Sequence, residues 1–185
     1  MRLEIRVAGF GGQGIIRTGL MLAMAACIHG NRNAVETQSY GPESRGGACK
    51  SEVVISDEEI DFPKVVDPDV LIAMSQEAYN TYVDTVKKGG IILLDPDLVQ
   101  KQKASSGIRV FRVPATRIAE ELGKTIVANV VMLGAFASIT HLMDAEALKK
   151  SVQDNIPKGT EKLNLAAFEK GYDYGKSLLK EKSEK

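Results

Sequence analysis

A glycine-rich turn near the N-terminus constrains the fold of this chain more than any other feature. It separates an apolar strand, Leu3 to Ala8, from a long apolar helix, Gly14 to His29. Its G-x-G-x-x-G spacing is typical of dinucleotide-binding folds, where the glycines permit a tight turn, a close phosphate and close packing of helix on strand. A phosphate cradle at the helix N-terminus would be formed by Gly9, Gly11, Gly12, Gln13 and Gly14. The alternative is a turn that needs glycine for steric reasons alone.

The order of the remaining segments predicts an α/β fold. Val70–Met74 and Ile91–Leu94 are continuous apolar runs of the length expected for buried parallel strands, each followed by a helical or turn pattern. Further strands are expected at Ala34–Gln38, Ala48–Ser56 and Arg109–Val113. We therefore expect a single Rossmann-like three-layer domain over residues 1–180, with a mainly parallel sheet and helices on both faces. Residues 181–185 are expected to be a frayed charged tail.

The second strand is not followed by the crossover helix of a standard dinucleotide fold. Residues 39–47 have no helical period and contain three glycines and a proline, so they are expected to form a stiff exposed loop between two strands. Glu36 lies near the position at which an acid would bind the ribose of NAD, about twenty residues past the motif. Without the crossover helix, a solvated carboxylate at the strand end is the favoured interpretation.

Two helices are apolar nearly all round, Gly14–His29 and Thr125–Met143. Such helices need covering on more than one side, and a partner chain would supply the second surface, so self-association is expected. The second run has a length at which a membrane span has to be considered, but Asn129, Ser138, Thr140 and His141 argue against a span.

Composition excludes several functions. Twenty-four Lys plus Arg balance twenty-four Asp plus Glu, which does not favour a nucleic-acid partner. Cys27 and Cys49 are too few for an iron–sulfur or zinc site and are expected to pack as small reduced hydrophobes in a cytoplasmic protein. His29 and His141 lie at the ends of apolar helices and are expected to pack or cap. No catalytic residue and no metal ligand is predicted in this chain.

Three stretches together resemble one family. The glycine turn, the segment Q-S-Y-G-P-E-S-R-G-G over residues 38–47, and Asn129 with Gly134 in the late apolar helix are similar to the gamma subunit of the 2-oxoacid:ferredoxin oxidoreductases. The continuation R-G-G-A-C-K-S-E, residues 45–52, looks most like the 2-oxoglutarate branch. The resemblance covers nearly the whole chain.

The resemblance implies a multi-subunit enzyme that decarboxylates a 2-oxoacid on thiamine diphosphate with Mg²⁺, reduces ferredoxin through iron–sulfur clusters and forms an acyl-coenzyme A. It implies alpha, beta and ferredoxin-like delta subunits as partners, which carry the thiamine and cluster sites. For this chain it implies subunit docking and a contact with coenzyme A, for which Ser39, Tyr40 and Arg45 join the glycine turn as candidate residues. Two alternatives remain: a non-catalytic assembly module, in which Arg45 pairs with a partner's carboxylate, and a stand-alone dinucleotide-binding protein.

Overall fold

The structure is a computed structural model that describes residues 1–41, 47–103 and 107–183. Arg45 lies outside these ranges. The strands are β1 (Arg2–Phe10), β2 (Asn33–Tyr40), β3 (Ala48–Ser56), β4 (Val70–Ala73), β5 (Ile91–Leu94) and β6 (Arg109–Arg112). The helices are α1 (Ile15–Met24), α2 (Gln76–Tyr82), α3 (Ala115–Glu121), α4 (Ala128–Thr140), α5 (Ala145–Asp154) and α6 (Glu161–Ser183). Short turns of other helix types are η1 (Ala25–His29), η2 (Val83–Thr85) and η3 (Thr125–Val127).

The sheet has six strands in the order β2-β3-β1-β4-β5-β6. β1 pairs in parallel with β4, and the parallel pairing continues through β5 to β6. β3 is antiparallel to both of its neighbours, so every strand except β3 runs in the direction of β1. The predicted mainly parallel sheet is confirmed. β2 ends at Tyr40 and β3 begins at Ala48, and a connection this short returns the chain antiparallel, whereas a parallel return needs a crossover. Ser39 and Tyr40 therefore belong to β2 and not to the predicted loop, of which residues 42–46 lie outside the described ranges.

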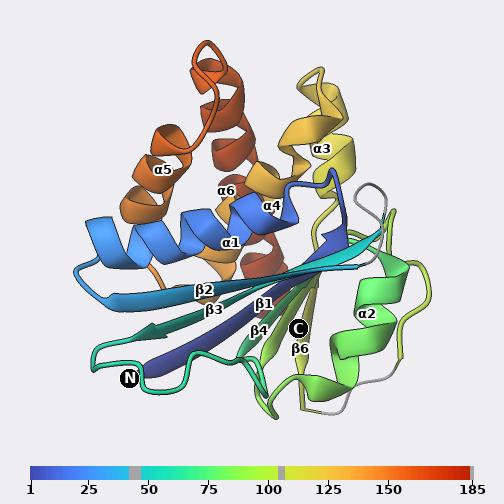
Figure 1. Cartoon of the computed structure of the whole chain (residues 1–185). Helices are drawn as coiled ribbons and strands as arrows, with labels where there is room; N and C mark the ends of the chain where they lie inside the picture. The colour runs from blue at the N-terminus through green and yellow to red at the C-terminus, as the bar shows by residue number, and fades with distance from the viewer. Residues whose placement is uncertain (42–46, 104–106, 184–185) are drawn as a thin grey trace.

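Helices cover both faces of the sheet, as predicted, but unevenly. Figure 1 shows α2 on one face, and α1, α4, α5 and α6 on the other. On the α2 face, Leu71 and Ile92 pack against Tyr79. The opposite face carries the larger apolar core, in which residues of β1, β3, β4 and β5 meet α1 and α4. α6 lies against α4 rather than directly on the sheet, which adds a further helical layer to the three that were predicted.

The expectation that a partner chain must cover the late apolar helix is wrong. Residues 128–139 of α4 are all buried within the chain itself. α6 supplies the cover, and it comes close because Gly134 faces the backbone of Phe168 and Gly171 faces the backbone of Val131. A side chain at either glycine would collide with the other helix. Within the described residues, no helix is long and apolar enough to cross a membrane.

The first apolar helix does present an uncovered face. Leu20 is 38% exposed and Ile28 is 61% exposed, while Ile16 and Met24 are half-buried on the same side. The α-helix ends at Met24 and continues as one π-helical turn, Ala25–His29, instead of running unbroken to His29. This turn leaves Cys27 exposed, so the expectation that both cysteines are packed inside is wrong for Cys27 and right for Cys49.

The structure also defines the ends of α2 and α6. α2 ends at Tyr82 and is followed by the 3-10 turn η2. α6 continues to Ser183, into the segment predicted to fray. The single-domain boundary at residue 180 and the fraying of the tail stay predictions.

Candidate functional site

The glycine turn is built as the motif predicts. Gly12 has φ +97° and Gly14 has φ +75°, a region that side chains with a Cβ rarely adopt. Gly9 is needed for space, because a Cβ there would meet the side chain of Gln13 and lie 2.8 Å from Cδ1 of Ile15. The three glycines therefore allow β1 to turn directly into α1.

The backbone amides of the turn are not all free to bind a ligand. Gly11 N–H donates to the carbonyl of Gly47 at 2.9 Å, and Gln13 N–H donates to the carbonyl of Phe10 at 3.2 Å. The N–H groups of Gly12 and Gly14 make no hydrogen bond with any residue that the structure describes, and the first-turn amides of α1 have no partner within the helix. An anion at this turn would therefore meet Gly12, Gly14 and the first turn of α1, but not Gly11 or Gln13.

The side chain of Gln13 ties the turn to the next strand. Its Oε1 accepts a hydrogen bond from Phe10 N–H at 2.7 Å, and its Nε2 donates to the carbonyl of Met74 at 2.7 Å. Met74 immediately follows β4, whose pairing with β1 places it beside the turn. Gln13 thus has a structural role, because its side chain hydrogen-bonds to two backbone groups.

Asn129 holds the start of α1 from the opposite side. Its Nδ2 donates to the carbonyl of Gly14 at 3.4 Å and to Oγ1 of Thr18 at 3.3 Å. Thr18 in turn donates its hydroxyl to Gly14 O at 2.8 Å. A Cβ on Gly14 would lie 2.6 Å from Asn129 Nδ2, so close contact of α1 and α4 at this point also requires glycine.

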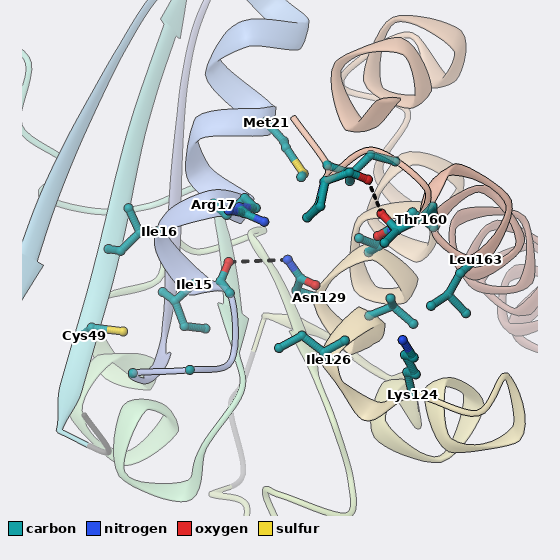
Figure 2. A pocket seen from close by; sticks show the side chains of 18 of the residues that line it. Ile15, Ile16, Arg17, Met21, Cys49, Lys124, Ile126, Asn129, Thr160 and Leu163 are labelled. Carbon is teal, nitrogen blue, oxygen red and sulfur yellow. Dashed lines mark hydrogen bonds between the residues drawn. The ribbon is translucent and has the colours of Figure 1, made fainter. Parts of the chain in front are cut away.

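A cavity of about 500 Å³ opens between the glycine turn, the start of α4 and the start of α6 (Figure 2). Arg17 reaches it from α1 and Lys124 from the segment before η3, on opposite sides. Neither makes an ion pair with a residue in the described ranges, and none of the lining residues there is acidic. The rest of the lining is mainly apolar: Ile15, Ile16, Met21, Cys49, Ile126, Val127, Val130, Ile156, Pro157 and Leu163. The site is therefore suited to an anion with an apolar or uncharged portion.

The other two described candidate residues lie near the end of β2. Tyr40 lines the 500 Å³ cavity and also a second hollow of about 240 Å³ beside α2; it is 63% exposed, and its hydroxyl donates to Oε1 of Gln38 at 3.1 Å. Ser39 lines only the second of these two hollows. The structure therefore brings Tyr40, but not Ser39, to the cavity beside the glycine turn.

Glu36 does not stand free at a strand end. It lies within β2, half-buried, and its carboxylate accepts hydrogen bonds from Oγ of Ser51 at 2.5 Å and from Nε2 of Gln38 at 2.9 Å. The interpretation as a solvated carboxylate is corrected accordingly. These partners occupy both carboxylate oxygens, and they leave Glu36 poorly placed as a ribose ligand.

Both histidines of the chain lie at helix ends. His29 pairs with Asp154 at 2.9 Å, and His141 adopts a left-handed conformation as the C-cap of α4, so both have structural roles at helix ends. Burial raises the pKa of the Cys49 thiol, which disfavours its thiolate. Among the described residues, no group of three or more His, Cys, Asp or Glu could hold a metal ion.

Residues 4–174 match the protein family described as pyruvate ferredoxin/flavodoxin oxidoreductase. The chain belongs to this family. It is 54% identical over 180 residues to the 2-oxoglutarate synthase subunit KorC of Methanocaldococcus jannaschii, covering 96% of both chains. It is 51% identical over 177 residues to the KorC of Methanothermobacter thermautotrophicus, covering 92% of this chain and 94% of the other.

Solved structures of the family share the fold. The gamma subunit of a keto/oxoacid ferredoxin oxidoreductase from Geobacter sulfurreducens superposes with a TM-score of 0.87 at 40% identity, covering 96% of this chain and 98% of that one. A 2-oxoglutarate:ferredoxin oxidoreductase from Magnetococcus marinus, solved with 2-oxoglutarate, coenzyme A and succinyl-CoA, matches with a TM-score of 0.82 at 29% identity. The match covers 97% of this chain but 31% of that longer one, so the same fold also occurs as part of a larger oxidoreductase chain.

Sequence reasoning missed the cationic pair of the cavity. Neither Arg17 nor Lys124 belongs to a motif, so no sequence signal identified them as candidates. The two residues lie far apart in the chain and face one space only because α1 and the segment before α4 are neighbours in the fold. Asn129 was singled out by the resemblance, and the structure adds its contact with Gly14.

Proposed function

We infer that this chain is the gamma subunit of a multi-subunit 2-oxoacid:ferredoxin oxidoreductase that acts on 2-oxoglutarate. The observation that carries this inference is the 54% identity to a 2-oxoglutarate synthase subunit along almost the full length of both chains. Relatives named for other 2-oxoacids are less similar: 37% for a ketoisovalerate oxidoreductase subunit and 29% for a pyruvate synthase subunit. This difference favours the 2-oxoglutarate branch.

The chain serves the enzyme without a redox or thiamine site of its own. The complex carries out thiamine-dependent oxidative decarboxylation to an acyl-coenzyme A, or the reverse carboxylation, with alpha, beta and ferredoxin-like delta subunits and with ferredoxin as electron acceptor in the cytoplasm. Cys27 is exposed and Cys49 is buried, and no described group of ligands suits an iron–sulfur cluster. In this proposal the thiamine, Mg²⁺ and cluster sites belong to the other subunits.

The contribution of this chain to chemistry is a phosphate contact with coenzyme A. The amides of Gly12 and Gly14 and the first turn of α1 offer donors to a phosphate, and the helix dipole favours its charge. Arg17 and Lys124 add positive charge beside the same cavity, with no described carboxylate competing for them. Arg45 stays a candidate for a further charge-assisted contact. These groups bind and orient the coenzyme, and they move no proton or electron.

The test is the assembled enzyme with Arg17→Ala or Lys124→Ala. Each should raise the KM for coenzyme A about tenfold, because a hydrogen bond to a charged group contributes about 1.5–3 kcal/mol when it is not fully solvated. The KM for 2-oxoglutarate should stay the same. Arg45→Ala is expected to act in the same way. Lys150→Ala, an exposed lysine on α5 away from the cavity, is the matched control.

A second candidate function, a purely structural assembly module, is favoured by the exposed apolar side of α1. Leu20 on α1 and Ile28 on the π-helical turn that continues it are exposed. An unchanged KM for coenzyme A in all three variants, together with weaker subunit association, would support this candidate.

A stand-alone dinucleotide-binding protein is disfavoured because Glu36 is bonded to Ser51. Saturable binding of NAD with a Kd below about 100 μM, which corresponds to a binding free energy beyond about 5 kcal/mol, would contradict the conclusion that dinucleotide binding is disfavoured.

A further inference from the structure

Two buried asparagines line the cavity beside the glycine turn. Asn129 stands in the first turn of α4 and Asn164 in the first turn of α6, and each is 6% exposed. Their side-chain NH₂ groups are both tied down. Asn129 Nδ2 donates to Gly14 O and Thr18 Oγ1, and Asn164 Nδ2 donates at 3.0 Å to both the carbonyl and the hydroxyl oxygen of Thr160.

These contacts fix which way each carboxamide is turned. A backbone carbonyl only accepts hydrogen bonds, so the NH₂ group must face it and Oδ1 must face the other way. Figure 2 shows the oxygen of Asn129 turned away from Gly14 and toward the interior of the cavity. In the part of the chain that the structure describes, neither Oδ1 accepts a hydrogen bond.

Neither oxygen is among the described side-chain atoms that are shut off from solvent without a partner, so both can be reached from the cavity. A molecule in the cavity that donates hydrogen bonds would find two free acceptors there. The cavity also offers Arg17, Lys124 and the unpaired amides of Gly12 and Gly14, which suit an acceptor with negative charge. Apolar side chains such as Ile126 and Leu163 make up much of the remaining lining. The cavity therefore combines groups that bind an anion with two acceptors that suit the N–H groups of an uncharged portion.

We propose that the cavity binds an organic phosphate whose uncharged part donates N–H hydrogen bonds to Oδ1 of Asn129 and Asn164. This inference rests on the coenzyme A contact proposed above and extends it from the phosphate to the rest of the molecule. Coenzyme A carries suitable donors in two places, the amides of its pantetheine arm and the exocyclic amino group of its adenine. The two asparagines are thus specificity residues that separate such a ligand from a simple phosphate.

The test compares three probes on the full-length chain by calorimetry: inorganic pyrophosphate, 4′-phosphopantetheine and adenosine 3′,5′-bisphosphate. Pyrophosphate has no N–H donor, and the other two carry the amides and the amino group separately. Asn164→Ala removes the acceptor far from the glycine turn. Asn155→Ala is the matched control, because Asn155 Nδ2 donates to the carbonyl four residues earlier, at Ser151, as Asn164 does at Thr160, but Asn155 does not line the cavity.

In Asn164→Ala the affinity for at least one of the two donor-bearing probes should fall about tenfold, while that for pyrophosphate stays within twofold. The probe that weakens identifies which part of the ligand reaches Asn164. Asn155→Ala should change none of the three. Equal weakening of all three probes, or no weakening of any, would overturn the inference while leaving the phosphate contact in place. Failure of the wild-type chain and of the assembled enzyme to bind any of the three would remove the phosphate contact as well.

Discussion

Gln13 Nε2 and the carbonyl of Met74 are joined by a 2.7 Å hydrogen bond that links the glycine turn after β1 to the residue that follows β4. The same side chain accepts from Phe10 N–H, so one residue braces both ends of the turn. The amides at Gly12 and Gly14 are therefore held in position before any ligand arrives, which reduces the ordering needed on binding. This preorganisation is the structural basis for treating the turn as a binding element.

Gln13→Ala should lower the free energy of unfolding by about 1–3 kcal/mol, because two backbone groups lose a partly buried partner. Gln13→Glu keeps an acceptor for Phe10 N–H but cannot donate to Met74 O, so it should also be destabilised. Urea denaturation followed by circular dichroism measures both. Gln153→Ala, at an exposed glutamine of α5, serves as the control and should be nearly neutral.

Gly14→Ala should be more harmful than Gly12→Ala. Both positions have positive φ, which costs a residue with a Cβ about 1–2 kcal/mol. At Gly12 the added Cβ meets no atom within 4 Å, whereas at Gly14 it overlaps Asn129, so the total cost there should be about 2–4 kcal/mol. Adding Asn129→Ala to Gly14→Ala should recover part of the loss. Additive effects of the two changes would show that the contact does not exist.

Gly12→Val is the corresponding functional probe. The open space at Gly12 lies where a phosphate would approach, and a β-branched residue resists positive φ. In the assembled enzyme it should raise the KM for coenzyme A more than Arg45→Ala does. The comparison is made at matched subunit content, and Gly159→Val, another positive-φ glycine with open space but outside the cavity, controls for backbone strain. Equal KM values for the two glycine variants would contradict the role of Gly12.

The isolated chain should form dimers or larger assemblies through the exposed apolar side of α1. Leu20→Glu places a charge on this side without entering the core, so light scattering at micromolar concentration should show weaker association with an unchanged melting temperature. Gln153→Glu adds the same charge at an exposed site on α5 and should leave association unchanged. A wild-type chain that is strictly monomeric at this concentration would refute the prediction.

The two cysteines should differ sharply in reactivity. Cys27 is exposed on the π-helical turn, while Cys49 is 8% exposed and burial raises the pKa of its thiol. Because the thiolate is the reactive form, Cys49 should react slowly with a thiol reagent at neutral pH and faster only as the pH rises above the usual range for cysteine. Cys27→Ser should abolish the fast phase. Adenosine 3′,5′-bisphosphate, which has the 3′-phosphate of coenzyme A but no thiol to consume the reagent, should slow the remaining reaction, because Cys49 lines the cavity.

The local features of this protein could be predicted from its sequence. Gly12 and Gly14 must adopt positive φ to turn a strand directly into a helix, and that requirement involves only neighbouring residues. The apolar runs at Val70–Ala73 and Ile91–Leu94 indicated buried parallel strands because their length and composition suit no exposed element. The resemblance at residues 38–47 and at Asn129 indicated the family before any contact was known.

The tertiary structure alone decided how the apolar helices are covered and which groups remain free to bind. α4 is buried by α6 because Gly134 and Gly171 let the two backbones approach, a complementarity between residues far apart in the sequence. The carbonyl of Gly47 accepts a hydrogen bond from Gly11 N–H, so this amide is not free to bind a ligand. Arg17, Lys124 and Asn164 line one cavity only because three segments of the chain meet in the fold. Periodicity and spacing report only local geometry, so a site assembled from long-range contacts becomes visible only when the chain is folded.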